Sequence, residues 1–463
     1  MGASQDATAR TCVLVIAVIS SFLPPFMASS INIALPAIGS EFSMDAVLLG
    51  WIATSYLLAA AVFLVPFGRL ADIYGMKRIF ASGLFIYTVS SLLSAMAPSA
   101  DVLIAVRVLQ GIGSAMLFGT ATAILISVFP PHERGRVLGI NVASVYVGLS
   151  VGPFIGGFLT QLLGWRSLFF INVPLGLVPL FLVLWVLKGE WAGAKGEKFD
   201  LAGSLLYSLM LISLMYGFTR LPGHLGKLMV LAGLLGFVGL IWWESRAKSP
   251  VLDVMLFRKN RVYAFSNLAA LINYSATFAV GFLMSLYLQY IKGLEPLAAG
   301  TILVAQPLMM AVFSPFAGRL SDKIEPRIVA SFGMALTFAG VLIFTFIQAD
   351  TSISFIVAGL VFLGIGIAFF SSPNTNAIMS SIERRHYGVG SATLGTMRLV
   401  GQVLSMGVVM LVLAVYMGRV EILRESYPEF MASMKTAFTI CTLLCFIGIF
   451  ASLARGDMRA KPQ

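Results

Sequence analysis

Gly68-Arg69-Leu70-Ala71-Asp72 has a second copy 250 residues further along the chain, Gly318-Arg319-Leu320-Ser321-Asp322. Two other short matches, Glu-Arg and Gly-Ile-Gly, recur in the same order at nearly the same offset. One such match would be chance, but three in order at nearly one spacing indicate an internal duplication. The chain is therefore predicted to consist of two related halves.

The composition around these copies is that of a membrane protein. Hydrophobic residues make up 59% of the 463 residues and charged residues only 11%, whereas a soluble domain carries about 25% charged residues. So few charges cannot cover a soluble particle of this size, so lipid must be the main solvent of the surface.

Fourteen apolar segments are long enough to cross the hydrocarbon core, which takes roughly 20 residues of helix. They lie near 12–35, 46–67, 79–97, 102–127, 137–161, 167–187, 201–219, 226–243, 263–290, 298–317, 328–347, 353–373, 388–415 and 436–454. Twelve crossings is the alternative, if the seventh and eighth segments do not both span.

The basic residues predict the orientation. With the N-terminus in the cytoplasm, most of the 31 Lys and Arg residues fall in cytoplasmic segments, as the positive-inside rule requires. We therefore expect a multi-pass protein of the cell (plasma or inner) membrane with both termini cytoplasmic. The same rule explains the net charge of +11 without a nucleic-acid partner.

Both copies of the repeated motif fall on the same side of the membrane, which indicates parallel repeats. The predicted fold is an all-α membrane protein of two six-helix bundles plus an inserted helix pair, with 14 transmembrane helices. We expect the first bundle in residues 1–187, cytoplasmic linkers and the inserted pair in 188–260, and the second bundle in 261–463.

Four motifs resemble the major facilitator superfamily, and in particular its 14-span drug:proton antiporter branch. They cover spans one, four and five and the loop after span two. The motifs are Asn32-Ile33-Ala34-Leu35-Pro36, the loop from Gly68 to Arg78, Arg107-Val108-Leu109-Gln110-Gly111-Ile112-Gly113, and the Gly-Pro pattern from Gly148 to Gly157. The resemblance implies a transporter that works by alternating access.

The loop after span two and its copy in the second half are expected to form a latch that closes the cytoplasmic side. The alternative is an ordinary positively charged loop. The latch residues implied by the resemblance are Gly68, Arg69, Asp72, Gly75, Lys77, Arg78, Gly318, Arg319 and Asp322.

The span-five pattern is similar to the motif associated with exporters rather than importers. Gly148, Gly152 and Gly156 recur every four residues, and such stripes of small residues let membrane helices approach closely. Together with Pro153 and Gly157, they are expected to form a hinge or seal between the halves, although ordinary helix packing would need the same residues.

Arg107 and Arg398 are the charges that lie well inside predicted spans. A charge at a helix centre costs about 2.5–3.5 kcal/mol, so such residues usually face a cavity or a partner, or bond to neighbouring carbonyls. Polar residues at similar depths add interhelical hydrogen bonds or a cavity lining. The candidate substrate or coupling residues are Asn32, Tyr56, Arg107, Gln110, Gln289, Gln306, Asn374 and Arg398.

Proton coupling, which the resemblance implies, lacks an obvious carrier. Met27 stands where the antiporter branch commonly has an acidic residue, and no Asp, Glu or His falls well inside a predicted span. A proton path would then use carboxylates near the membrane surface, which are Glu41, Asp45, Asp72 and Asp101. Facilitated transport, or coupling of another kind, is the alternative.

The predicted function is that of a secondary active transporter, acting as a monomer, that exports hydrophobic or amphipathic small molecules in exchange for protons. The alternative is a carrier of lipids or amphiphilic organic anions that needs no protons. The sequence has no phosphate-binding loop and no cluster of nucleophilic or metal-ligating residues, so we expect neither an enzyme, nor a metal, nor a cofactor.

Overall fold

The computed structural model describes residues 2–187, 189–194, 196–197, 199–246, 254–383, 387–418 and 420–456. Part of the predicted linker, including Lys188, Lys195 and Lys198, lies outside these ranges. The described residues form helices and loops without a β-strand.

Fourteen helical segments of the described chain are long and apolar enough to cross a membrane, which confirms the predicted number. The first eight are α1 (Gly2–Phe42), α2 (Ala46–Tyr74), α3 (Met76–Ala95), α4 (Ala100–Val128), α5 (Pro131–Leu163), α6 (Arg166–Val186), α7 (Leu201–Arg220) and α8 (His224–Glu244).

The short helix α9 (Val254–Lys259) precedes the last six crossings. These are α10 (Arg261–Leu286) with the π-helical turn η1 (Tyr287–Ile291), α11 (Pro296–Leu303) with α12 (Ala305–Lys323), α13 (Pro326–Phe344), α14 (Ile353–Ser380), α15 (Tyr387–Tyr416), and α16 (Tyr427–Leu453) after the 3-10 turn η3 (Arg424–Ser426).

Two predicted spans differ from the structure. The segment 298–317 was expected to be one helix, but it breaks at Val304 into α11 and α12. Pro307 causes the break, because a proline has no N–H to donate to the carbonyl four residues earlier, that of Leu303. The last span begins at Tyr427 rather than at 436, since Pro428 and Glu429 in its first turn suit a helix start.

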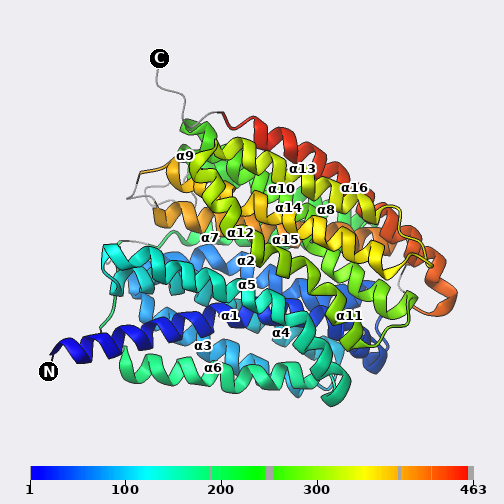
Figure 1. The fold of residues 1–463 in the computed structure, drawn as a ribbon, viewed down its shortest axis with the longest axis horizontal. Helices are drawn as coiled ribbons and strands as arrows, with labels where there is room; N and C mark the ends of the chain where they lie inside the picture. The colour runs from blue at the N-terminus through cyan, green and yellow to red at the C-terminus, as the bar shows by residue number, and fades with distance from the viewer. Residues whose placement is uncertain are drawn as a thin grey trace.

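The two halves repeat one packing scheme (Figure 1). In the first half α1 packs on α5, α2 on α4, and α3 on α4 and α6. In the second half α10 packs on α15, α12 on α14, and α13 on α14 and α16. These are the corresponding helices in the same order, as parallel repeats require, and Figure 1 places the first half below the second. The division at residues 187 and 260 stays our proposal.

The start of α1 and the end of α16 lie at one end of the helices, toward the left of Figure 1. We call this end the terminal face and the other end the opposite face. Hydrogen bonds between the halves gather toward the opposite face. Ser285 Oγ donates to Asn32 O (2.6 Å), Gln289 Nε2 donates to Ile33 O (3.0 Å), and the N–H of Ala46 donates to Val420 O (3.2 Å).

The inserted pair, α7 and α8, is fixed to both halves through α7. The buried Tyr207 hydroxyl donates to the carbonyl of Ala61 in α2 (2.9 Å). Met215 and Phe218 pack against Gly407 of α15, where an added Cβ would lie only 3.1 Å and 3.2 Å from them. Helix α7 therefore covers the line along which α2 and α15 meet.

Replacing Tyr207 with Phe should lower the melting temperature of the purified protein in detergent, because a hydrogen bond that contributes about 1 kcal/mol is lost. Tyr216→Phe is the matched control, since that hydroxyl is exposed and bonds only within its own helix, to Arg220. Equal melting curves for the two variants would contradict the role given to Tyr207.

Candidate functional site

A cavity of about 290 Å³ lies between the two halves. Its walls come from α1, α2, α4 and α5 of the first half and from α10, α11, α12, α14 and α15 of the second. The lining residues lie in the middle part of each membrane crossing, for example Leu149 of α5 and Thr277 of α10. The cavity is therefore at mid-depth in the membrane, where secondary transporters built from repeats hold their substrates.

Four of the eight predicted substrate or coupling residues line this cavity: Asn32, Tyr56, Gln306 and Arg398. The exporter-motif residue Pro153 also contributes to the wall. The structure therefore brings together polar side chains that come from both halves and lie up to 366 residues apart in the sequence.

Aromatic side chains form much of the rest of the wall, and nothing in the sequence singles them out among 35 phenylalanines and 13 tyrosines. Tyr146 and Tyr274 lie on opposite halves, as do Phe118 and Phe278, and none of the four is among the predicted cavity residues. The Tyr274 hydroxyl lies 3.4 Å from Ser371 Oγ. Only the hydroxyl groups at mid-span could have marked the two tyrosines as cavity residues.

Arg398 supplies the single charged side chain among the residues that line the cavity. Its guanidinium carbon lies 5.7 Å from the centre of the Phe118 ring, across the cavity on α4. Such a position over an aromatic ring is favourable for a cation. The lining includes no Asp, Glu or His, so the cavity combines apolar walls with one positive charge.

Arg107 and Gln110 do not line the cavity but are buried behind it. Arg107 Nε donates to Ile52 O (3.1 Å), and its Nη1 donates to Gln110 Oε1 (2.6 Å). Gln110 Nε2 donates in turn to Ser91 Oγ (2.8 Å). The guanidinium also lies 4.4 Å from the centre of the Tyr56 ring. This network joins α2, α3 and α4, and the buried guanidinium donates to a backbone carbonyl and an amide oxygen.

Gln289 and Asn374 also lie outside the cavity wall. Gln289 forms the bond between the halves described above, and Asn374 Nδ2 donates to the carbonyl of Ser266 (3.1 Å), joining α14 to α10. Both amides therefore act in this structure as links between helices, which is the common role of such residues in membrane proteins.

The loop between α2 and α3 is held by the linker that follows α6. The N–H of Met76 donates to Trp191 O (2.8 Å), and the N–H of Ala194 donates to Asp72 O (2.9 Å). Arg69 forms an ion pair with Glu197 of the same linker. In this structure, the predicted latch residues of the first copy therefore contact the linker that follows α6.

Glu190 is the centre of this contact. Its carboxylate accepts the N–H of Lys77 in the first turn of α3 (2.7 Å) and lies 3.6 Å from Arg78 Nε. An anion at this position is favourable because the helix N-terminus carries a partial positive charge. Gly75 is required there, since its φ is +118° and an added Cβ would lie 2.3 Å from the Glu190 carboxyl carbon.

The second copy of the latch motif packs on α14 at the same face. Asp322 Oδ1 accepts a hydrogen bond from Asn376 Nδ2 (3.2 Å), and a Cβ at Gly318 would lie 2.9 Å from Ser372 Oγ. Arg319 is exposed. The first copy differs: a Cβ at Gly68 would meet nothing within 4 Å, whereas a Cβ at Gly119 of α4 would lie 3.4 Å from Gly68 Cα.

The exporter-motif residues of α5 divide between two faces of that helix. Gly148, Gly152 and Gly156 face α1 of the same half, where added Cβ atoms would lie 1.8–2.9 Å from its atoms. Gly157 faces α11 of the other half, where its Cβ would lie 2.4 Å from Pro296 O. A Cβ at Gly300 would similarly lie 2.1 Å from Pro153 O. The close contact between halves thus rests on Pro153 and Gly157.

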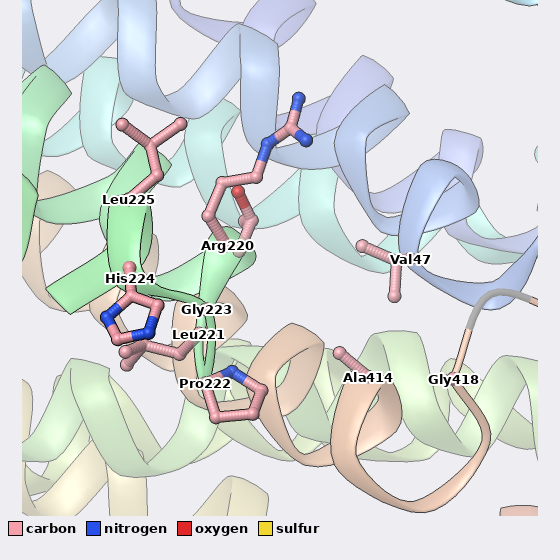
Figure 2. Close-up of a pocket in the computed structure, with 10 residues that line it drawn as sticks. Val47, Arg220, Leu221, Pro222, Gly223, His224, Leu225, Ala414 and Gly418 are labelled. Carbon is pink, nitrogen blue, oxygen red and sulfur yellow. The ribbon is translucent and has the colours of Figure 1, made fainter.

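A second hollow, of about 370 Å³, lies at the opposite face between the α7–α8 turn and the ends of α2 and α15 (Figure 2). Figure 2 shows Arg220 and His224 of that turn beside Val47 and Ala414. The Arg220 guanidinium donates to the Tyr216 hydroxyl (2.7 Å). This hollow is separate from the central cavity and shares no lining residue with it.

Changing Glu190 to Ala should loosen the linker after α6, because the first turn of α3 loses its acceptor at a cost of about 1 kcal/mol. Hydrogen exchange of the amides of Met76 and Ala194 measures this directly and should become faster. In Glu190→Gln the acceptor oxygen remains, so exchange should rise less. Unchanged exchange in both variants would contradict the contact.

Changing Gly157 to Leu should abolish transport while the protein still inserts and folds, because the new side chain separates the halves at the α5–α11 contact. Gly152→Leu is the comparison: it strains packing inside one half, where overpacking costs about 1–3 kcal/mol, and should chiefly lower the melting temperature. Normal transport by the Gly157 variant would show that this contact is not needed.

Comparison with known proteins identifies the family. The model of the Major Facilitator Superfamily matches residues 17–243 and 267–463. The chain is 30% identical over 449 residues to the riboflavin transporter RibZ of Clostridioides difficile, covering 95% of this chain and 96% of that protein. It is 31% identical over 395 residues to the tetracenomycin C resistance and export protein of Streptomyces glaucescens, covering 84% and 73%.

Another relative is the multidrug resistance protein Stp of Mycobacterium tuberculosis, 30% identical over 394 residues, with 84% of this chain and 73% of that protein covered. Among solved structures, a bacterial homologue of the human lysosomal transporter Spinster, in an inward-facing and unoccupied conformation, has the same fold. The TM-score is 0.67 at 17% identity, over 96% of this chain and 97% of that one. The chain belongs to the major facilitator superfamily, and it is a membrane transporter rather than an enzyme.

Proposed function

We propose that this protein is a secondary active exporter of hydrophobic or amphipathic small molecules that works by alternating access. The observation that carries the proposal is the mid-depth cavity, which both repeated halves line and which a rocking motion of one half against the other would expose to either side. We place the terminal face in the cytoplasm of a cell membrane, on the bias of the basic residues, and propose a monomer as the working unit.

Export is supported by two independent features. The relative from Streptomyces glaucescens is named for resistance and export, and the relative from Mycobacterium tuberculosis for multidrug resistance. In this chain, Pro153 and Gly157 of the motif associated with exporters form the close contact between the halves. We therefore propose that transport runs from the cytoplasm outward.

The lining supports an amphipathic substrate. The rings of Tyr56, Phe118, Tyr146, Tyr274 and Phe278 offer flat apolar contacts, while a few amides and Arg398 offer polar ones. Binding sites for small organic molecules generally combine a mostly apolar wall with few polar groups that fix orientation. Riboflavin, the substrate in the name of one relative, has this character, and we propose planar aromatic compounds with a polar edge.

Proton exchange, the driving force that the resemblance implies, would use carboxylates outside the cavity. Glu41 accepts hydrogen bonds from Trp165 and Arg166 (both 2.7 Å), and Asp45 caps α2 at Leu48 N (2.7 Å). Both lie toward the opposite face, whereas Asp72 lies at the terminal face. We propose that protons, where they are exchanged, enter and leave at these two faces.

A second candidate is a carrier of amphiphilic organic anions or lipids that needs no proton exchange. Arg398 favours it, because a cavity with one positive charge and no carboxylate in its lining attracts anions more than cations.

Transport by the purified protein in proteoliposomes tests the proposal. We expect riboflavin to accumulate several-fold when a pH gradient is imposed and Asp72→Asn to slow this accumulation. Accumulation that ignores the pH gradient would remove proton exchange from the proposal. If neither riboflavin nor any hydrophobic dye moves under any gradient, the assignment as an exporter of such compounds is wrong.

A further inference from the structure

We infer that the central cavity binds aromatic organic anions through Arg398 and that the membrane potential can drive their export without proton exchange. This inference rests on the proposed export function but not on proton coupling. It assigns a class of substrate and a source of energy to the cavity.

Arg398, which is half-buried, differs from the fully buried Arg107 in how its charge is satisfied. Arg107 donates hydrogen bonds to Ile52 O and Gln110 Oε1. The Arg398 guanidinium lies over the Phe118 ring and forms no hydrogen bond or ion pair with the residues that the structure describes. Five N–H donors in a fixed fork are thus left to a bound molecule, and this fork matches the oxygens of a carboxylate, sulfonate or phosphate.

The surroundings of Arg398 suit an anion with a flat body. Gln402 lies one turn further along α15 and also lines the cavity, so its amide can add a donor beside the guanidinium. Phe118 and Tyr146 lie on the facing half and offer ring faces for an aromatic body. A cationic substrate would instead meet Arg398 without any carboxylate in the lining to balance it, and like charges in a poorly hydrated site repel strongly.

The charge of the substrate also sets its driving force. A cell interior is electrically negative, so outward movement of an anion is downhill in the membrane potential. One elementary charge crossing the membrane changes the equilibrium ratio about tenfold for every 60 mV. A cavity without a titratable carboxylate is then sufficient, because the cycle exports one negative charge and needs no proton in return.

Three dansyl probes of similar size and shape but different charge test whether the cavity selects its substrate by charge. Dansyl-taurine carries a fixed sulfonate, a dansyl trimethylammonium amide carries a fixed cation, and dansyl amide is neutral. Transport is measured in proteoliposomes at equal pH on both sides, with a protonophore present and the potential set by potassium and valinomycin. We expect the sulfonate to accumulate in the positive compartment, approaching tenfold for every 60 mV or so, and the cation not to be transported.

Variants of Arg398 test the binding site itself. Arg398→Gln should slow sulfonate transport at least tenfold and leave dansyl amide transport within about threefold, and Arg398→Lys should restore part of the sulfonate rate. Arg220→Gln, at the opposite face and outside the cavity, is the matched control and should change neither. Melting temperatures show whether Arg398→Gln still folds. If it does not, the sulfonate transport rate of Arg398→Lys tests the binding role of Arg398.

The outcomes separate this inference from the proposed function. Sulfonate uptake that requires a pH gradient, or that is unaffected in Arg398→Gln, would overturn the inference. Transport of dansyl amide and riboflavin in the same vesicles would then still support an exporter of neutral compounds. Failure of every probe, including riboflavin, would instead remove the proposed function.

Discussion

The absence of water from the hydrocarbon core is the constraint on which this structure depends. Each backbone N–H and C=O group at that depth must be paired within the protein, which leaves helices as the solution for a chain without barrel strands. Side chains obey the same rule, so every polar group at mid-depth must find a partner helix or face a cavity. The arrangement of the fourteen crossings can be understood as the way this chain meets that requirement.

Two arginines within the membrane-crossing helices, the buried Arg107 and the half-buried Arg398, show both solutions. Arg107 is enclosed by α2, α3 and α4, and its charge is met by a carbonyl and an amide oxygen. Arg398 instead lines the central cavity between the halves, with its guanidinium over the Phe118 ring. Arg107 therefore stabilises the packing within the first half, whereas Arg398 places a positive charge in the cavity between the halves.

Close helix contacts explain how two halves can enclose this space and still be separate bodies. Within the first half, the stripe of Gly148, Gly152 and Gly156 lets α5 lie directly on α1. Between halves, Gly157 and Gly300 let α5 and α11 approach equally closely, from Pro153 in the cavity wall toward the opposite face. Helix α7 adds a bridge over the meeting line of α2 and α15. At the terminal face, Glu190 and Glu197 of the linker after α6 hold the loop between α2 and α3.

The sequence by itself determined the number of crossings, because hydropathy and helix length are local properties of each segment. It also determined the two-fold repeat and the family, because these depend on short motifs that are visible in the sequence. It also marked Asn32, Tyr56, Gln306 and Arg398, since polar residues are conspicuous in apolar spans. Only the tertiary structure separated these from Arg107, Gln110, Gln289 and Asn374, because the direction of a side chain depends on which helices surround it. The contact of Glu190 with the loop at Gly75, between residues 115 positions apart, was likewise decided by how the helices pack.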